Sequence, residues 1–283
     1  MATAPSDLPK DEAKCVAPIP VPTHGPGGVF SVACSTTIAA PPLACLEKVL
    51  DLSGYPEWNT FIPKASVASA APTPTGEDSL APELQTLAAR PGYAAPGAKL
   101  RFDAVMSPGA SPRKVDIEVT FLEAFEVSSG GDAGKKRRGY RVAWKATGMP
   151  HFLLHSERVQ EFVEGATTSS SADGSVETTT TEYACWETFG GVLGYVLPRA
   201  QLEDGFMRWM SGLKKATDHS VLGEKKSVIL GAAKPERSVT KVKDIQKGAF
   251  PQEVVDEITS TGQKVDEMGG GDFKVKPLKL PPK

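Results

Sequence analysis

Several stretches of the chain alternate between apolar and polar residues, which is the pattern of a β-strand with one buried face. The clearest is VDIEVTF, residues 115–121, where every second side chain is apolar. Most of the connections between such stretches are too short for a crossover helix, so we expect an antiparallel meander. The predicted strands span residues 28–38, 64–70, 96–106, 115–125, 140–146, 153–163 and 176–189.

Two segments show the helical period instead of the strand period. Residues 43–50 form a short stripe of apolar positions, bounded by prolines that are tolerated in a first helical turn. Residues 201–220 predict a long amphipathic helix whose bulky side must pack on another element. Its apolar side consists of Leu202, Phe206, Trp209, Met210, Leu213 and Ala216.

An aromatic stretch, DLSGYPEWNTFIP, occupies residues 51–63. Tyr55, Trp58 and Phe61 are spaced so that a short helical turn brings them to one face. We expect Ser53 to cap this turn and Pro63 to end it. Such a turn is either the lip of a pocket or an ordinary anchor in the core.

This stretch resembles the YPxWNPF segment of the START/polyketide cyclase-like (SRPBCC) superfamily, which is related to the birch-pollen allergens. Thr60 stands where the family often has proline. Three further segments are similar to family patterns: PGAKL at 96–100, WETFGG at 186–191, and the closing helix around Gly205 and Phe206, where Met210 comes one position late. The matching residues of the first segment are Tyr55, Pro56, Trp58, Asn59 and Phe61.

The resemblance covers residues 28–220 in the order of the helix-grip fold. It implies an α+β domain in which a curved antiparallel sheet wraps a long C-terminal helix, with two short helices after the first strand. Residues 71–96 are expected to be a loop insertion with one helical turn. Residues 1–27 and 221–283 are rich in proline, glycine and small or charged residues, so we expect flexible tails.

Composition indicates which kinds of partner and which cellular compartment to expect. The 283 residues carry a formal net charge of −2, which gives no indication of nucleic acid or of an acidic membrane as a partner. The four cysteines are scattered, which favours free thiols, and no secretory leader or membrane-spanning run is recognisable. We therefore expect a cytoplasmic protein without a transmembrane segment; its protein partners are unknown.

No high-specificity catalytic, nucleotide or metal motif is present, so no cofactor and no metal are expected. Phe162 should point inward from its strand, which places Gln160 and Arg158 on the inner face too. A buried arginine needs an anionic partner, and Glu187 is the candidate. If the strand were shifted by one residue, Arg158 and Glu187 would instead form a surface pair.

His151 and His155 are four residues apart, which on a strand separates them by about 13 Å and prevents them from sharing one metal ion. The basic run at 135–138 is interpreted as a solvated hairpin loop, because no aromatic residues are interleaved with it.

The preferred hypothesis is a protein that binds a hydrophobic small molecule, such as a polyketide, sterol, lipid or isoprenoid, between the sheet and the closing helix. The predicted ligand-binding residues are Tyr55, Trp58, Phe61, Trp144, Arg158, Gln160, Tyr183 and Phe206. The alternative is a polyketide cyclase or dehydratase-type enzyme using the same cavity, with His155, Arg158 and Glu187 as catalytic candidates. A third possibility, a scaffold protein, predicts no accessible cavity.

Overall fold

One antiparallel sheet curls around the C-terminal helix. The structure, a computed structural model, describes residues 7–71, 80–128, 136–165 and 179–231. Within them, eight strands follow the order β1-β2-β8-β7-β6-β5-β4-β3. The strands are β1 (Ala13–Val16), β2 (Phe30–Ile38), β3 (Lys64–Ser69), β4 (Lys99–Ala104), β5 (Arg113–Ser128), β6 (Lys136–Ala146), β7 (His155–Glu164) and β8 (Thr181–Gly190).

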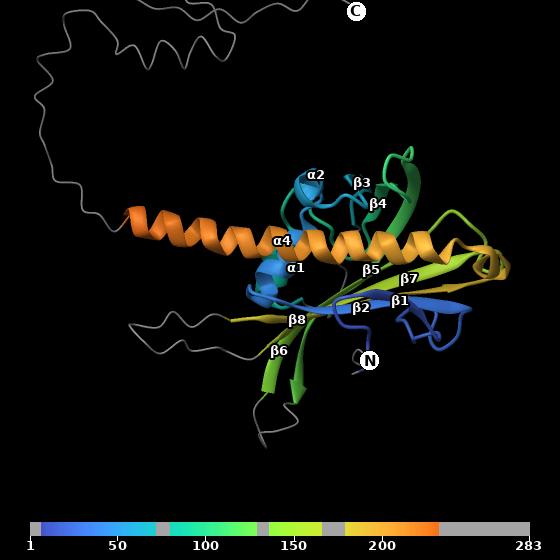
Figure 1. The fold of residues 1–283 in the computed structure, drawn as a ribbon, viewed down its shortest axis with the longest axis horizontal. Coiled ribbons are helices and arrows are strands. Elements are labelled where there is room, and N and C mark those ends of the chain that lie inside the picture. The colour runs from blue at the N-terminus through green and yellow to red at the C-terminus, as the bar shows by residue number, and fades with distance from the viewer. Residues whose placement is uncertain (1–6, 72–79, 129–135, 166–178, 232–283) are drawn as a thin grey trace, which may run out of the picture. The chain divides into compact units, whose positions relative to one another are not determined.

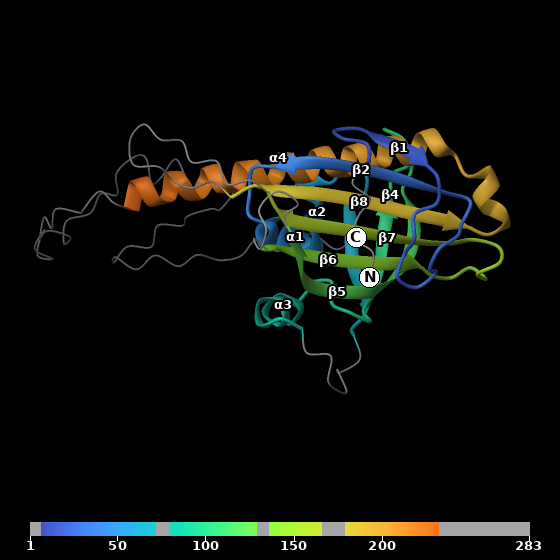
Figure 2. The same ribbon diagram turned by 90° about the horizontal axis from the view of Figure 1, so that it is seen from below.

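The helices lie on the concave side of this sheet or at its ends. Figure 1 shows β2 and β8 on one side of the C-terminal helix and β3 and β4 on the other. Figure 2 shows that β4 runs across the direction of β2, β8 and β6. This is the helix-grip fold that the resemblance implies. The helices are α1 (Pro42–Leu50), η1 (Leu52–Gly54), α2 (Tyr55–Trp58), α3 (Pro82–Ala88), η2 (Val192–Val196) and α4 (Arg199–Gly231).

The apolar stripe of α4 fills the concave side of the sheet, as its helical period predicts. Leu202, Phe206, Trp209, Met210 and Leu213 are all buried in the main core. A hydrogen-bond network also ties the helix to the sheet. The Gln160 Oε1 atom accepts from Tyr183 Oη at 2.8 Å and from Trp209 Nε1 at 2.9 Å.

The N-terminal segment is part of the sheet, so the prediction of a flexible tail is wrong for residues 7–27. Strand β1 pairs with β2, and Ile19 and Val21 are buried in a second cluster that contains Val159 and Trp186. The expectation relied on proline and small residues, which here form an extended cover over the outer face of the sheet. Trp186 Nε1 donates to the Pro20 carbonyl at 3.2 Å, and Ile19 N donates to Ser31 Oγ at 2.8 Å.

Strand β5 begins as predicted and then changes face. A β-bulge between Val119 and Phe121 moves the strand out of simple alternation. Leu122 therefore enters the main core, whereas Phe121 packs with the cluster on the outer face. The inward position predicted for Phe121 is wrong because an extra residue in one strand exchanges its faces.

The other boundaries agree with the predictions in part. The expected helical turn in the insertion is α3, and residues 72–79 lie outside the described residues. Helix α4 continues to Gly231, so the predicted tail cannot begin at residue 221. Residues 1–6 and 232–283, which were also assigned to tails, lie outside the described residues.

Asp51, not Ser53, caps the aromatic turn. The Asp51 carboxylate accepts from the backbone N–H groups of Ser53 and Gly54 at the start of η1. Helix α2 ends at Trp58, before Pro63, because Asn59 turns the chain and its Oδ1 accepts from Phe61 N and Ile62 N.

Replacing Asp51 by alanine should therefore destabilise the protein by about 1 kcal/mol, the usual cost of losing an N-cap side chain. Ser53→Ala is the matched control and should cost less, because the Ser53 hydroxyl only donates to Asp51. Urea unfolding of both variants measures the difference. Equal losses would show that the carboxylate does not act as the cap.

Candidate ligand site

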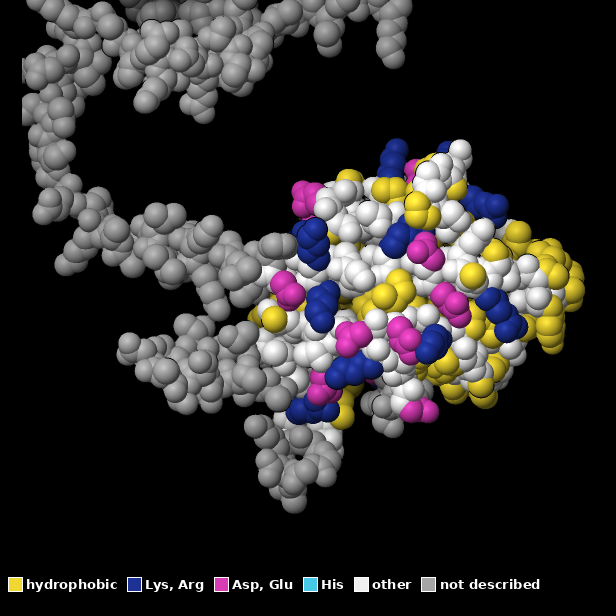
Figure 3. All heavy atoms as spheres, viewed as in Figure 1, with side chains coloured by type: hydrophobic (Ala, Val, Ile, Leu, Met, Phe, Trp, Pro, Cys, Tyr) yellow, Lys and Arg dark blue, Asp and Glu magenta, His cyan; other side chains and the backbone are white. Residues whose placement is uncertain are grey.

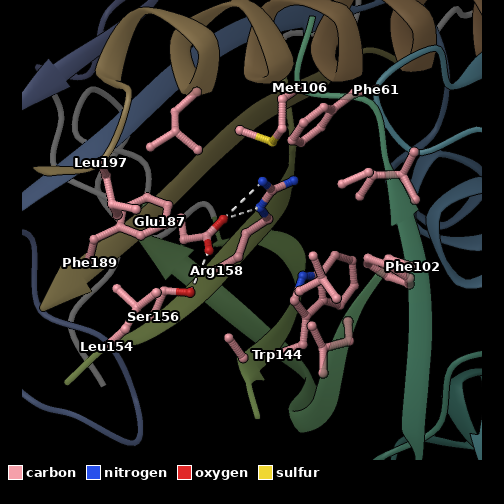
Figure 4. Close-up of a pocket in the computed structure, with 16 residues that line it drawn as sticks. Phe61, Phe102, Met106, Trp144, Leu154, Ser156, Arg158, Glu187, Phe189 and Leu197 are labelled. Atoms are coloured by element: carbon pink, nitrogen blue, oxygen red, sulfur yellow. Dashed lines mark hydrogen bonds and ion pairs between the residues drawn. The ribbon is translucent and has the colours of Figure 1, made fainter. Parts of the chain in front are cut away.

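A cavity of about 190 Å³ lies under the first part of α4, against the curved β4–β8 portion of the sheet (Figure 4). Nearly all of its walls are apolar, and the exceptions are three polar side chains from neighbouring positions on β7 and β8. The lining residues are Phe61, Ile62, Phe102, Ala104, Met106, Val115, Ile117, Trp144, Ala146, Leu154, Ser156, Arg158, Glu187, Phe189, Leu197 and Leu202.

The three polar residues form one connected group. Arg158 and Glu187 are directly opposite each other in the β7–β8 register. The Glu187 Oε2 atom accepts from Arg158 Nε at 2.9 Å and lies 2.9 Å from Nη2, while Oε1 accepts from Ser156 Oγ at 2.7 Å. The inward placement of Arg158 excludes the alternative in which the strand was shifted by one residue.

Aromatic rings enclose the guanidinium of Arg158. Its central carbon lies 4.1 Å from the ring centroid of Phe206, 5.3 Å from that of Trp209 and 5.7 Å from that of Phe61. These distances are those of cation–π contacts. The charge is thus held between a carboxylate on the sheet and the aromatic underside of α4.

One nitrogen of this guanidinium makes no hydrogen bond with the described residues. Among the described residues, the buried Nη1 atom of Arg158 has no hydrogen-bond partner. Burial is the largest single effect and lowers the pKa of Arg158, but the charge and hydrogen bond of Glu187, together with the nearby Cys185 and Tyr183, outweigh it. The pKa therefore lies above its ordinary value and the side chain remains charged. A charged donor without a partner in an apolar cavity favours an anion or another acceptor beside it.

Four of the predicted site residues line the cavity: Phe61, Trp144, Arg158 and Glu187. The others belong to the packing around it. Tyr55 and Trp58 are buried in the core. These two residues of the aromatic turn therefore anchor it in the core and do not form the lip of this cavity. Gln160, Tyr183 and Phe206 seat α4 on the sheet or cover Arg158, and none of them is among the lining residues.

His155 lies away from the cavity, on the outer side of β7. Its ring stacks on that of His151 with centroids 3.7 Å apart, and the ring of His24 lies 4.7 Å from it. The predicted 13 Å separation of the two histidines is wrong because His151 precedes the strand, in a turn. This position does not support His155 as a catalytic group acting in the cavity.

Sequence reasoning missed Ser156 and most of the apolar lining. The two-residue period of the strand predicted at 153–163 places Leu154 and Ser156 on the same face as Arg158, but neither was assigned to the site. Leu197 lies in a loop, where no period indicates which way a side chain points. Phe102 and Met106 fall on one face of the strand predicted at 96–106, and both line the cavity.

The described part of the chain contains no group of three His, Cys, Asp or Glu side chains arranged to hold a metal ion. All four cysteines are free thiols. Within the same residues, no helix is both long enough and apolar enough to cross a membrane.

Comparison with known proteins gives one curated relative and a set of distant structures. No family model matches the chain. The "Oxopyrrolidines biosynthesis cluster protein O" of Penicillium oxalicum is 29% identical over 164 residues, which cover 58% of this chain and 72% of the relative.

The similar solved structures share little sequence with this chain. A START superfamily protein from Mycobacterium smegmatis has 13% identity and a TM-score of 0.35, covering 68% of this chain and 97% of that one. The di-domain ARO/CYC protein StfQ of the steffimycin biosynthetic pathway has 12% identity and a TM-score of 0.37, covering 75% and 53%. Norcoclaurine synthase from Thalictrum flavum has 8% identity and a TM-score of 0.33, covering 66% and 92%.

Removing one member of the buried ion pair should cost more than removing both. Glu187→Gln leaves the buried Arg158 charge without its partner, and we expect a loss of about 3 kcal/mol in the free energy of unfolding. The double variant Arg158→Met/Glu187→Leu should lose clearly less. Urea unfolding of the single and double variants measures this coupling, and additive losses would contradict it.

Stability should also depend on pH through His24. Burial, followed by the charge of His155, lowers the pKa of His24 below its ordinary value of 6.5. Below about pH 6.5 the unfolded chain therefore binds more protons at this site, so its contribution to stability falls as the pH falls. His24→Phe should flatten the loss measured between about pH 7.5 and 5.5, and an unchanged slope would contradict this assignment.

Proposed function

We propose that the chain binds a small, mainly apolar molecule that carries an anionic or hydrogen-bond-accepting group. The observation that supports this most directly is the unpaired Nη1 atom of Arg158, held charged in an apolar cavity. In this proposal the ligand's polar group takes the place of the missing partner, and rings such as Trp144 and Phe102 contact its apolar part. Burial supplies most of the affinity, and Arg158 sets the orientation.

The size of the cavity narrows the ligand class. A cavity of about 150 Å³ is large enough for benzene, whereas sites for drug-sized ligands occupy about 300–1,000 Å³. The observed volume of about 190 Å³ suits one ring or a short chain. A polyketide, sterol or isoprenoid would therefore be bound by one end unless the cavity widens.

A role in natural-product biosynthesis follows if the function of the relative is shared. That relative is named for an oxopyrrolidine biosynthesis cluster, and the matching segment covers 58% of this chain. We place this chain, as a proposal, in a pathway that makes a small secondary metabolite.

An enzymatic role is the second candidate, because a carboxylate and a guanidinium lie side by side in the cavity. Glu187 would accept a proton from the substrate, and Arg158 Nη1 would stabilise the resulting enolate. The hydrogen bonds that Glu187 already accepts from Ser156 and Arg158 use part of its capacity and favour the orienting role.

The test compares an anionic and a neutral probe of one shape. Phenylacetate and ethylbenzene are titrated into the full chain and into Arg158→Met by calorimetry or NMR. Phenylacetate should lose at least about tenfold in affinity in the variant, the usual value of a charge-assisted hydrogen bond, while ethylbenzene should bind equally well to both.

Arg101→Met is the matched control. Arg101 also pairs with a carboxylate on the adjacent strand, Asp116, but both side chains are about half exposed. This variant should bind both probes as the unaltered chain does. Failure of the unaltered chain to bind either probe, together with a lack of co-purifying small molecules in native mass spectrometry, would reject the proposal.

A further inference from the structure

Five large apolar side chains are exposed together at one end of the molecule. We call Met149, Phe152, Val192, Tyr195 and Val196 the apolar tip. Phe152 is 71% exposed, and Tyr195 and Val196 are each 74% exposed, which is unusual for side chains of this size. Figure 3 shows hydrophobic side chains gathered at the right-hand end, where Figure 1 shows the turn before α4.

Two loops build this tip and are joined to each other. Val192 N donates to the Phe152 carbonyl at 3.0 Å, and Leu193 N donates to the Leu153 carbonyl at 2.9 Å. Gly191 makes this approach possible. Its φ is 85°, and a Cβ atom there would lie 2.7 Å from the carbonyl carbon and oxygen of Leu153. The tip is therefore a built surface and not a pair of independent loops.

The sequence around the tip lacks charge. Residues 146–156 and 188–198 contain no Asp, Glu, Lys or Arg. A basic residue precedes the first stretch, Lys145, and another follows the second, Arg199. Glu157 follows the first stretch and Glu187 precedes the second. Neither is exposed: Glu157 accepts a hydrogen bond from Thr120, and Glu187 accepts one from Ser156.

The two loops that carry the tip also contribute to the cavity wall. Leu154 follows Phe152 in the first loop, Leu197 follows Val196 in the second, and both leucines line the cavity. The exposed tip and the cavity are therefore built in part from the same two loops.

We propose that the apolar tip docks on the surface of a phospholipid bilayer. Phe152, Tyr195 and Val196 insert into the boundary between headgroups and acyl chains, and Lys145 and Arg199 lie at the level of the phosphates. Aromatic and aliphatic side chains without charge, with basic residues behind them, match that chemical gradient. That the cavity's ligand enters from the bilayer is a corollary that rests on the proposed function.

A bilayer fits this surface better than a protein partner does. Protein interfaces surround an apolar centre with a polar rim that makes directed hydrogen bonds, and the two loops offer few side chains for such a rim. The formal net charge of −2 describes the whole chain and gave no indication of membrane binding. Binding of a bilayer by the tip depends instead on the charges near the tip, which are basic. Lys145 lies 3.5 Å from Glu118. The exposed Arg199 has no carboxylate partner among the described residues, and its guanidinium lies 4.5 Å from the ring centroid of Phe30.

The test is flotation of the full chain, without added ligand, with vesicles of phosphatidylcholine containing about 30% phosphatidylserine. The unaltered chain should float with the vesicles, and Phe152→Ser/Tyr195→Ser should reduce its partition coefficient at least about tenfold. Arg199→Gln should weaken binding to these vesicles more than binding to pure phosphatidylcholine. Circular dichroism should show unchanged folding, because the altered side chains are exposed.

Val127→Ser is the matched control, since this half-buried valine lies near the opposite end of β5. It should bind vesicles as the unaltered chain does. Three results would overturn the proposal: no flotation of the unaltered chain, equal flotation of the tip variant, or concentration-dependent self-association in sedimentation that the tip variant abolishes. The probe-binding test of the proposed function uses no vesicles, so the two can fail separately.

Discussion

The buried charge of Arg158 is the constraint on which the rest of the site depends. A guanidinium in this position requires a carboxylate, and the β7–β8 register supplies Glu187 directly across from it. It also requires a roof that excludes water, which Phe206 and Trp209 of α4 provide. The ion pair and the aromatic rings above it therefore determine where the charged group of this apolar cavity lies.

Two successive inward residues of strand β7, Arg158 and Gln160, have different roles. Arg158 forms the ion pair with Glu187 and leaves its buried Nη1 atom without a partner among the described residues. Gln160 Oε1, in contrast, accepts from Tyr183 and Trp209 and so fixes the helix. If Arg158 contacts the ligand as proposed, ligand contact and helix position are set by successive inward residues of one strand. This arrangement holds a binding group more precisely than a loop would.

Much of the fold could be predicted from the sequence, because strands and the closing helix leave clear periods and one buried arginine implies a nearby carboxylate. The Arg158–Glu187 pair was found in this way. The N-terminal cover was missed because its stability comes from contacts with Trp186 and Val159, far away in the chain. The face exchange in β5 was missed because a bulge has no periodic signature. The loop residue Leu197 was missed because the orientation of a side chain in a loop is set by the tertiary structure.

Gly191 links the structure of the exposed tip to the shape of the cavity wall. The glycine lies where the loop after β8 touches the loop before β7, and the space beside Leu153 is too small for a methyl group. Any side chain acquired there would have to wedge the loops apart. Since the same loops carry both the exterior tip and part of the cavity wall, a single substitution would remodel outside and inside together. During divergence, the exposed surface at this end and the shape of the cavity would then change as one inherited trait.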